Sequence, residues 1–132
     1  FMAISKALLK TKALQGLSPD KILSEVNELL VPENESCMFV TVFCVVLDIK
    51  TGNVEFSNGG HNPPLVSKAG GDFEYMDVPK GFVVGPVSGS KFIKKEMVLK
   101  PNEAIFLYTD GVTEAMNEKG ELFSEGRLKD SL

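Results

Sequence analysis

The stretch that decides the fold is MFVTVFCVVL, residues 38–47. It is apolar on both alternations and rich in β-branched and aromatic side chains, which favours a β-strand covered on both faces of a sheet. A turn sequence follows at Lys50–Asn53, and Val54–Ser57 fits the returning strand of a hairpin. The sequence therefore predicts an antiparallel sheet with residues 38–47 as a central strand.

Further short strands are predicted downstream of this hairpin. Leu65–Ser67 and Phe73–Met76 flank one polar turn, and Phe92–Leu99 and Ala104–Thr109 flank another. Antiparallel strands linked by hairpins are thus expected throughout residues 37–110.

A pair of helices is predicted upstream, over residues 1–31. Phe1 to Leu14 carries apolar residues at helical spacing, and Gly16 ends this first helix. Ser18 and Pro19 start the second, as N-cap and first helical residue. The buried stripe of the second helix is expected to comprise Ile22, Val26, Leu29 and Leu30.

Helices followed by a run of strands indicate an α+β fold. The polar sequence from Thr113 onward predicts a mixed helical segment over residues 111–132. The 132 residues suit one domain, no apolar run is long enough for a membrane span, and no signal peptide is visible.

Charge and cysteine content narrow the function classes. With 14 basic and 18 acidic residues, the net charge of −4 argues against a nucleic-acid binder and against contact with an anionic membrane. Cys37 and Cys44 fall in the same predicted strand, roughly 23 Å apart, so they cannot pair within it. Free cysteines fit the cytoplasm, and a single histidine without a Cys-x-x-Cys pair disfavours structural zinc.

Asp110 is the most informative single residue. It ends the apolar run Ala104–Thr109 and precedes Gly111, which permits a tight turn. A carboxylate at the end of a buried strand can point at a ligand, and a hard cation such as Mg²⁺ or Mn²⁺ is the natural one. The alternative is that Asp-Gly is simply a turn after a strand.

A second candidate is the loop around His61, the only histidine. Its near-neutral titration would suit acid–base catalysis or phosphate contact, and its alternative is a ring that stiffens the loop. Asn62 precedes Pro63 and is a good turn former, while Gly59 and Gly60 predict positive φ or close backbone approach. Glu114 is a candidate second carboxylate or, more simply, a helix start.

Two motifs together resemble a known family. They are SNGGHNPPL at residues 57–65 and LYTDGVTEA at residues 107–115, and segments at Phe39–Thr41, Leu47–Gly52 and Asn117–Leu128 match in the same order. The chain resembles the SpoIIE/RsbU-type serine/threonine phosphatases, the bacterial branch of the metal-dependent PP2C-like (PPM) phosphatases.

This resemblance implies an α-β-β-α sandwich of two antiparallel sheets with helices outside. It implies hydrolysis of phosphoserine or phosphothreonine by a water activated between two Mn²⁺ or Mg²⁺ ions. Asp110 is then a metal ligand supported by Gly111. His61 and Asn62 become candidates for substrate binding, and His61 is also the only candidate for a catalytic group.

The resemblance also implies partners. The expected substrate is a phosphorylated anti-sigma-factor antagonist, a small STAS-domain protein, and a sensory or receiver domain is expected upstream in the full-length chain. The family's other metal-binding acidic blocks have no counterpart here, so we expect a domain truncated at both ends. Open sheet edges would favour pairing with another chain, and a homodimer is therefore one expectation.

Three hypotheses follow. The first is a partial metal-dependent phosphatase domain, which alone should be weakly active or inactive because too few carboxylates remain for two cations. The second is a non-catalytic phosphatase-fold module that binds an anti-sigma or antagonist partner. The third is an unrelated α+β domain in which Asp110 only forms a turn.

Overall fold

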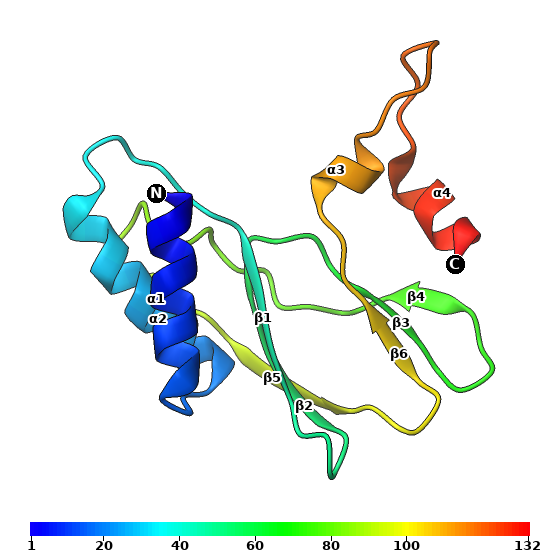
Figure 1. The fold of residues 1–132 in the computed structure, drawn as a ribbon, viewed down its shortest axis with the longest axis horizontal. Coiled ribbons are helices and arrows are strands. Elements are labelled where there is room, and N and C mark those ends of the chain that lie inside the picture. The colour runs from blue at the N-terminus through cyan, green and yellow to red at the C-terminus, as the bar shows by residue number, and fades with distance from the viewer. The chain divides into compact units, whose positions relative to one another are not determined.

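The computed structural model describes residues 1–132, which divide into two compact units (Figure 1). Unit 1 comprises Phe1–His61 and Val78–Val98, and unit 2 comprises Asn62–Asp77 and Leu99–Leu132. Each unit contains one three-stranded sheet, and every strand pair is antiparallel. No helix has the length and apolar character needed to cross a membrane.

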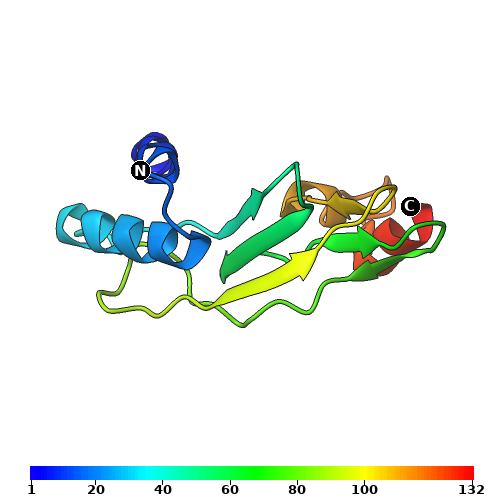
Figure 2. The same cartoon turned by 90° about the horizontal axis from the view of Figure 1, so that it is seen from below.

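The two predicted helices of unit 1 are confirmed as α1 (Met2–Leu14) and α2 (Pro19–Leu30), with a short 3-10 turn, η1 (Val31–Glu33), after them. Gly16, between the helices, has a φ of +74°, which a residue without Cβ adopts at little cost. Ser18 occupies the N-cap position of α2, although its side chain makes no capping hydrogen bond. Figure 2 shows α1 beside α2, and α2 in turn contacts the sheet.

The sheet of unit 1 has the order β1-β2-β5. Its strands are β1 (Val42–Leu47), β2 (Asn53–Gly59) and β5 (Lys94–Val98). The prediction of a central strand at 38–47 is wrong: β1 lies at an edge, is at most half-buried and starts at Val42, whereas β2 is central. An unbroken apolar run cannot by itself distinguish a central strand from an edge strand packed by a helix.

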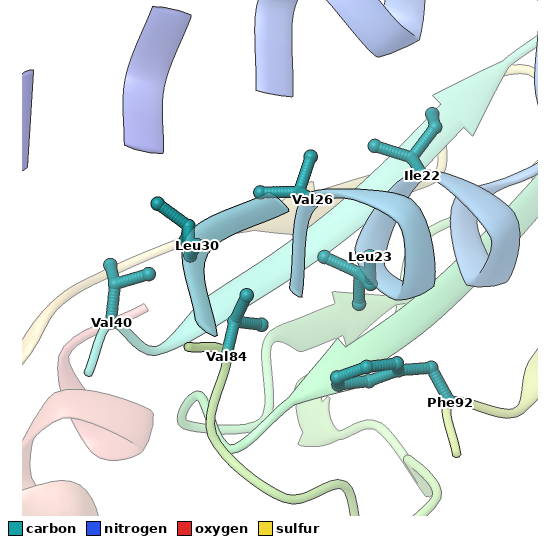
Figure 3. Close-up of a cluster of buried hydrophobic side chains, with 7 residues drawn as sticks. All are labelled: Ile22, Leu23, Val26, Leu30, Val40, Val84 and Phe92. Atoms are coloured by element: carbon teal, nitrogen blue, oxygen red, sulfur yellow. The ribbon is translucent and has the colours of Figure 1, made fainter. Parts of the chain in front are cut away.

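The core of unit 1 lies between α2 and this sheet (Figure 3). Leu23 is fully buried, whereas Leu29 is 47% exposed, so the predicted stripe was wrong at Leu29 and omitted Leu23. The cluster consists of Ile22, Leu23, Val26, Leu30, Val40, Val84 and Phe92.

Hydrogen bonds join α2 to the loop that precedes β5. Buried Asn27 accepts from the Gly85 backbone N–H at 2.8 Å and donates to the Val87 carbonyl at 2.8 Å. Glu28 accepts from the Ser88 hydroxyl and from the Gly89 N–H, each at 2.7 Å, and these bonds lower the pKa of the Glu28 carboxyl. The loop is therefore held by side chains of α2.

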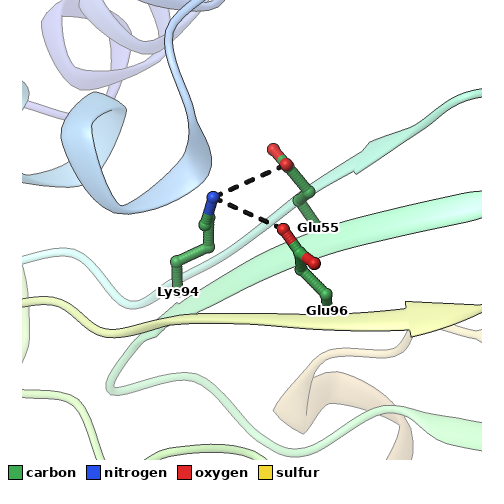
Figure 4. Close-up of polar contacts among 3 residues, drawn as sticks. All are labelled: Glu55, Lys94 and Glu96. Atoms are coloured by element: carbon green, nitrogen blue, oxygen red, sulfur yellow. Dashed lines mark ion pairs between the residues drawn. The ribbon is translucent and has the colours of Figure 1, made fainter.

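An ion-pair cluster joins β2 and β5 on their surface (Figure 4). The Lys94 ammonium lies 3.6 Å from a Glu55 carboxylate oxygen and 3.5 Å from one of Glu96. Glu55 and Glu96 face each other directly in the strand register. The single cation thus offsets the repulsion between two opposed carboxylates.

Both cysteines are free, as expected. They do not share a strand, however: Cys37 lies before β1 with a φ of +51° and is exposed, while Cys44 lies within β1. Burial raises the pKa of the Cys44 thiol to about 11.

Unit 2 is built on the sheet order β4-β3-β6. Its strands are β3 (Leu65–Ser67), β4 (Phe73–Tyr75) and β6 (Ala104–Phe106). Two helices follow, α3 (Asp110–Thr113) and α4 (Ser124–Ser131), which agree with the predicted mixed helical segment. The buried core is small and consists of Leu65, Tyr108 and Leu128, with partly buried aromatic rings around it.

Candidate functional site

Asp110 is not at the end of a buried strand, contrary to the prediction. β6 ends at Phe106 and is at most half-buried, and Asp110 is the exposed first residue of α3. Thr109 stands at the N-cap position with an extended backbone. Threonine followed by aspartate is a helix-start signal, and it prevails here over the strand propensity of the preceding residues.

Gly111 lies inside α3 and lacks the positive φ that a glycine-dependent tight turn would require. A Cβ added at Gly111 would meet only the Thr109 hydroxyl oxygen, at 3.8 Å. The turn-forming role predicted for Gly111 is therefore not needed for the backbone observed.

Asn62 and Asp110 are brought together in unit 2. The Asn62 Nδ2 donates a hydrogen bond to Asp110 Oδ1. In the antiparallel pair of β3 and β6, Leu65 is opposite Phe106, so the chain just before Leu65 and the chain just after Phe106 leave the sheet at the same end. This contact could not be predicted from the sequence, because the register of these two strands is not evident from the residues.

The backbone around Asn62 is anchored on the same sheet. Pro64 is fully buried, and its carbonyl accepts from the Met76 N–H at 2.8 Å. Fully buried Leu65 then begins β3. These contacts fix the loop from which the half-buried Asn62 projects.

The segment before Asp110 is anchored by Tyr108, which is 6% exposed. Its ring makes an edge contact with Tyr75, with ring centroids 6.5 Å apart, and the Tyr75 hydroxyl donates to the Glu125 carbonyl at 2.8 Å. Burial raises the pKa of the Tyr108 hydroxyl, so this group stays neutral in the physiological range. Tyr108 is thus a packing residue that fixes where α3 begins.

His61 is the last residue of the first segment of unit 1, whereas Asn62 belongs to unit 2. The His61 side chain is half-buried, and its backbone N–H donates to the Asn58 Oδ1 at 2.9 Å. Gly60 has a φ of +73°, and a Cβ there would lie 2.8 Å from a Val83 methyl group. The prediction that Gly59 and Gly60 serve positive φ or close approach is confirmed, since a Cβ at Gly59 would likewise lie 2.9 Å from a Val84 methyl group.

The residues present fit a divalent cation only in part. Asp110 offers an exposed carboxylate, the kind of oxygen ligand that Mn²⁺ and Mg²⁺ prefer. No group of three or more His, Cys, Asp or Glu side chains within residues 1–132 could hold a metal ion. Glu114 ends α3 as its C-cap and does not complete such a group.

Comparison with known proteins identifies the family of this chain. The family model for Stage II sporulation protein E (SpoIIE) matches residues 1–132. The chain belongs to the SpoIIE family. The recognition of a SpoIIE/RsbU-type, PP2C-like phosphatase from the two sequence motifs is therefore confirmed.

Two curated proteins illustrate the similarity. The chain is 33% identical over 107 residues to protein IcfG of Synechocystis, covering 80% of this chain and 17% of that protein. It is 24% identical over 121 residues to the phosphoserine phosphatase RsbU of Bacillus subtilis, covering 92% of this chain and 36% of RsbU. The SpoIIE-family chain thus spans about a third or less of the length of these relatives.

Solved structures show the fold. The RsbU and RsbW domains of Rv1364c from Mycobacterium tuberculosis match with a TM-score of 0.78 and 26% identity, covering 96% of this chain and 35% of that chain. The Mn-presoaked phosphatase domain of Bacillus subtilis SpoIIE matches with a TM-score of 0.50 and 13% identity, covering 86% and 50%. The predicted α+β, PP2C-like fold class is confirmed.

Proposed function

We propose that residues 1–132 are part of a metal-dependent protein serine/threonine phosphatase domain that hydrolyses phosphoserine or phosphothreonine. The family match over the whole chain carries this proposal. Two similar proteins support the reaction class: one is named a phosphoserine phosphatase, and the other is the phosphatase domain of SpoIIE. The structure of that phosphatase domain was determined after presoaking with Mn.

Within this function Asp110 is the proposed metal ligand. Its side chain is exposed at the start of α3, where a carboxylate and the helix dipole are also mutually favourable. Two Mn²⁺ or Mg²⁺ ions, when bound, would polarise the phosphoryl oxygens and activate a water. The contribution of this chain is one carboxylate in a fixed position, so other ligands must come from outside residues 1–132.

The proposed substrate is a phosphorylated anti-sigma-factor antagonist of the STAS type. The similarity to a structure that joins RsbU and RsbW domains supports a setting in anti-sigma-factor regulation, by analogy with that protein. His61 stays a candidate for substrate contact, because its half-buried ring lies in the glycine-bounded loop next to Asn62. A homodimer and a sensory or receiver domain elsewhere in the full-length chain remain part of this proposal.

A non-catalytic module that binds an antagonist or anti-sigma partner is the second candidate. One observation favours it: residues 1–132 contain no group of three potential metal ligands. The two candidates differ in whether the full-length protein supplies the remaining carboxylates around Asp110.

Mn²⁺-dependent hydrolysis of p-nitrophenyl phosphate by the full-length protein tests the choice. We expect turnover that requires Mn²⁺ and is abolished by Asp110→Asn, which keeps the side-chain shape but removes the negative charge. Glu118→Gln, at an exposed carboxylate of the same unit, is the matched control and should leave turnover unchanged. Full activity of Asp110→Asn would refute the assignment, and absence of activity in the wild-type protein would favour the binding module.

A further inference from the structure

We propose that Lys80 is a substrate-binding residue, which together with His61 forms a subsite for the phosphate monoester group of the substrate. This inference rests on the proposed phosphatase function and deepens it, because it adds a cation to the candidate substrate contact at His61. The subsite itself needs no metal ion, since its two side chains supply positive charge and hydrogen-bond donors.

The segments that carry His61 and Lys80 lie side by side in unit 1. Asn58 joins them and is only 6% exposed. Its Oδ1 accepts from the His61 backbone N–H at 2.9 Å, and its Nδ2 donates to the Pro79 carbonyl at 3.4 Å. One buried side chain therefore fixes the backbone of His61 relative to the backbone just before Lys80.

Glycines allow the two segments to approach so closely. A Cβ added at Gly81 would overlap the Asn58 carbonyl oxygen, and a Cβ at Gly60 would lie 2.8 Å from a Val83 methyl group. Glycine fits both positions without a shift of the backbone. The residue after Gly60 and the residue before Gly81 are therefore carried by closely packed backbone.

The charge of this region differs from that of the whole chain. The net charge is −4, yet residues 78–95 contain four lysines and no Asp or Glu, and residues 56–61 contain no acid either. Lys80 is exposed and takes part in none of the ion pairs of this chain. Its ammonium group is therefore available to an anion, and lysine binds phosphate groups as a point charge.

The hydrogen bonds in place determine which groups can contact the anion. The His61 backbone N–H already donates to Asn58, so the contact must come from side chains. The half-buried imidazole of His61 can donate one hydrogen bond, and the Lys80 ammonium supplies the charge. A phosphate monoester and inorganic phosphate offer the same anionic oxygens. The proposed ligand is the monoester, and inorganic phosphate forms a separate arm of the test.

Hydrolysis of p-nitrophenyl phosphate by the full-length protein tests the role of Lys80. Lys80→Gln should raise KM about 10-fold with kcat unchanged, the loss expected for one charge-assisted hydrogen bond that is made equally throughout the reaction. Lys80→Arg, which keeps the charge, should restore most of the affinity. Lys50→Gln removes the same charge from another exposed lysine of unit 1 and should leave KM unchanged. An unchanged KM in Lys80→Gln would overturn the proposal.

Asn58→Ala tests whether the position of His61 matters for substrate binding. Asn34 is a matched control in the same unit: it is 8% exposed, accepts from the Met38 N–H at 2.8 Å and donates to the Gly85 carbonyl at 2.9 Å. Both alanine variants should lower the melting temperature, but only Asn58→Ala should raise KM. An equal KM in the two variants would exclude a positioning role for Asn58.

Lysine acetylation of the metal-free full-length protein, measured by peptide mass spectrometry, detects binding without turnover. p-Nitrophenyl phosphate should slow acetylation of Lys80 and leave Lys50 unaffected. Protection of Lys80 in a protein that proves inactive with Mn²⁺ would support the subsite and refute the proposed function. Protection by inorganic phosphate alone would overturn the assignment to the monoester. Protection by neither anion would overturn the subsite, while Mn²⁺-dependent turnover that is lost in Asp110→Asn would leave the proposed function standing.

Discussion

In unit 1 an amphipathic helix, α2, covers the sheet, and the buried core draws on α2, on the segment just before β1 and on the loop that precedes β5. In unit 2 the buried core cluster has three residues, the two helices are short and each strand has three residues. Yet unit 2 carries Asp110 and Asn62, the residues of the candidate site. The larger core and the proposed metal ligand thus lie in different units, so a stability assay and a metal-binding assay should report on different parts of this chain.

Leu23→Ala gives the largest expected effect and tests whether the core of unit 1 dominates stability. Leu23 is fully buried, so the cavity should lower the free energy of unfolding by about 2–5 kcal/mol. Urea denaturation measures the change. Leu29→Ala on the same helix, where Leu29 is 47% exposed, is the control and should cost less than about 1 kcal/mol. Equal costs at the two positions would contradict the packing described.

Substitutions of buried polar groups should change the stability of the two units by different amounts. Asn27→Ala in unit 1 would leave the Gly85 N–H and the Val87 carbonyl without their partner, and should cost about 1–3 kcal/mol. Tyr108→Phe in unit 2 removes a buried hydroxyl that makes no hydrogen bond, and should change stability by about 0.5 kcal/mol or less. Thermal melts of both variants measure this difference, and a cost for Tyr108→Phe as large as for Asn27→Ala would be inconsistent with it.

Glycine substitutions probe the backbone of the two motifs. Gly60→Ala in unit 1 forces a side chain into positive φ against Val83, and should cost at least about 1–2 kcal/mol. Gly111→Ala in unit 2 meets open space within a helix, so stability should be unchanged or higher by up to about 1 kcal/mol. Chemical denaturation measures the free energy of unfolding of both variants. If Gly111→Ala lowered it as much as Gly60→Ala, the backbone at Gly111 would have to be a strained turn, contrary to the structure.

The smallest expected effect concerns cysteine alkylation, whose rate at Cys44 reports local opening of unit 1. With its pKa raised to about 11, Cys44 should carry a thiolate in about one molecule per thousand at pH 8. Exposed Cys37 should therefore react first with iodoacetamide, as measured by peptide mass spectrometry. Simultaneous modification of both residues in the native protein would show that β1 opens readily.

Local signals predicted much of unit 1 and of the element order. Gly16 and Pro19 correctly predicted the end of α1 and the start of α2, because each residue acts on the backbone next to it. The edge position of β1 could not be predicted, since strand order depends on pairing between distant segments. For the same reason the Asn62–Asp110 contact escaped prediction, as it depends on the register between β3 and β6.

The role of Asp110 as a metal ligand stays a prediction. The motif around it identified the family correctly, but the expected position at a strand end gave way to a helix start. Thr109 fits both a strand and a helix start, because it is β-branched and also a good N-cap residue. The local sequence therefore does not decide whether Asp110 ends a strand or begins a helix.

The opposed carboxylates of β2 and β5 show what selects the alignment of these strands. Shifting β5 by one residue would place Lys95 opposite Glu55 in place of Glu96, an attractive pair worth about 0–1 kcal/mol at a surface. The same shift would turn Met97 away from Val54 to the opposite face, at a larger cost in apolar contact. Apolar contact therefore outweighs charge pairing in setting the register of β2 and β5. Substituting charged residues on β5 should alter solubility without changing this register.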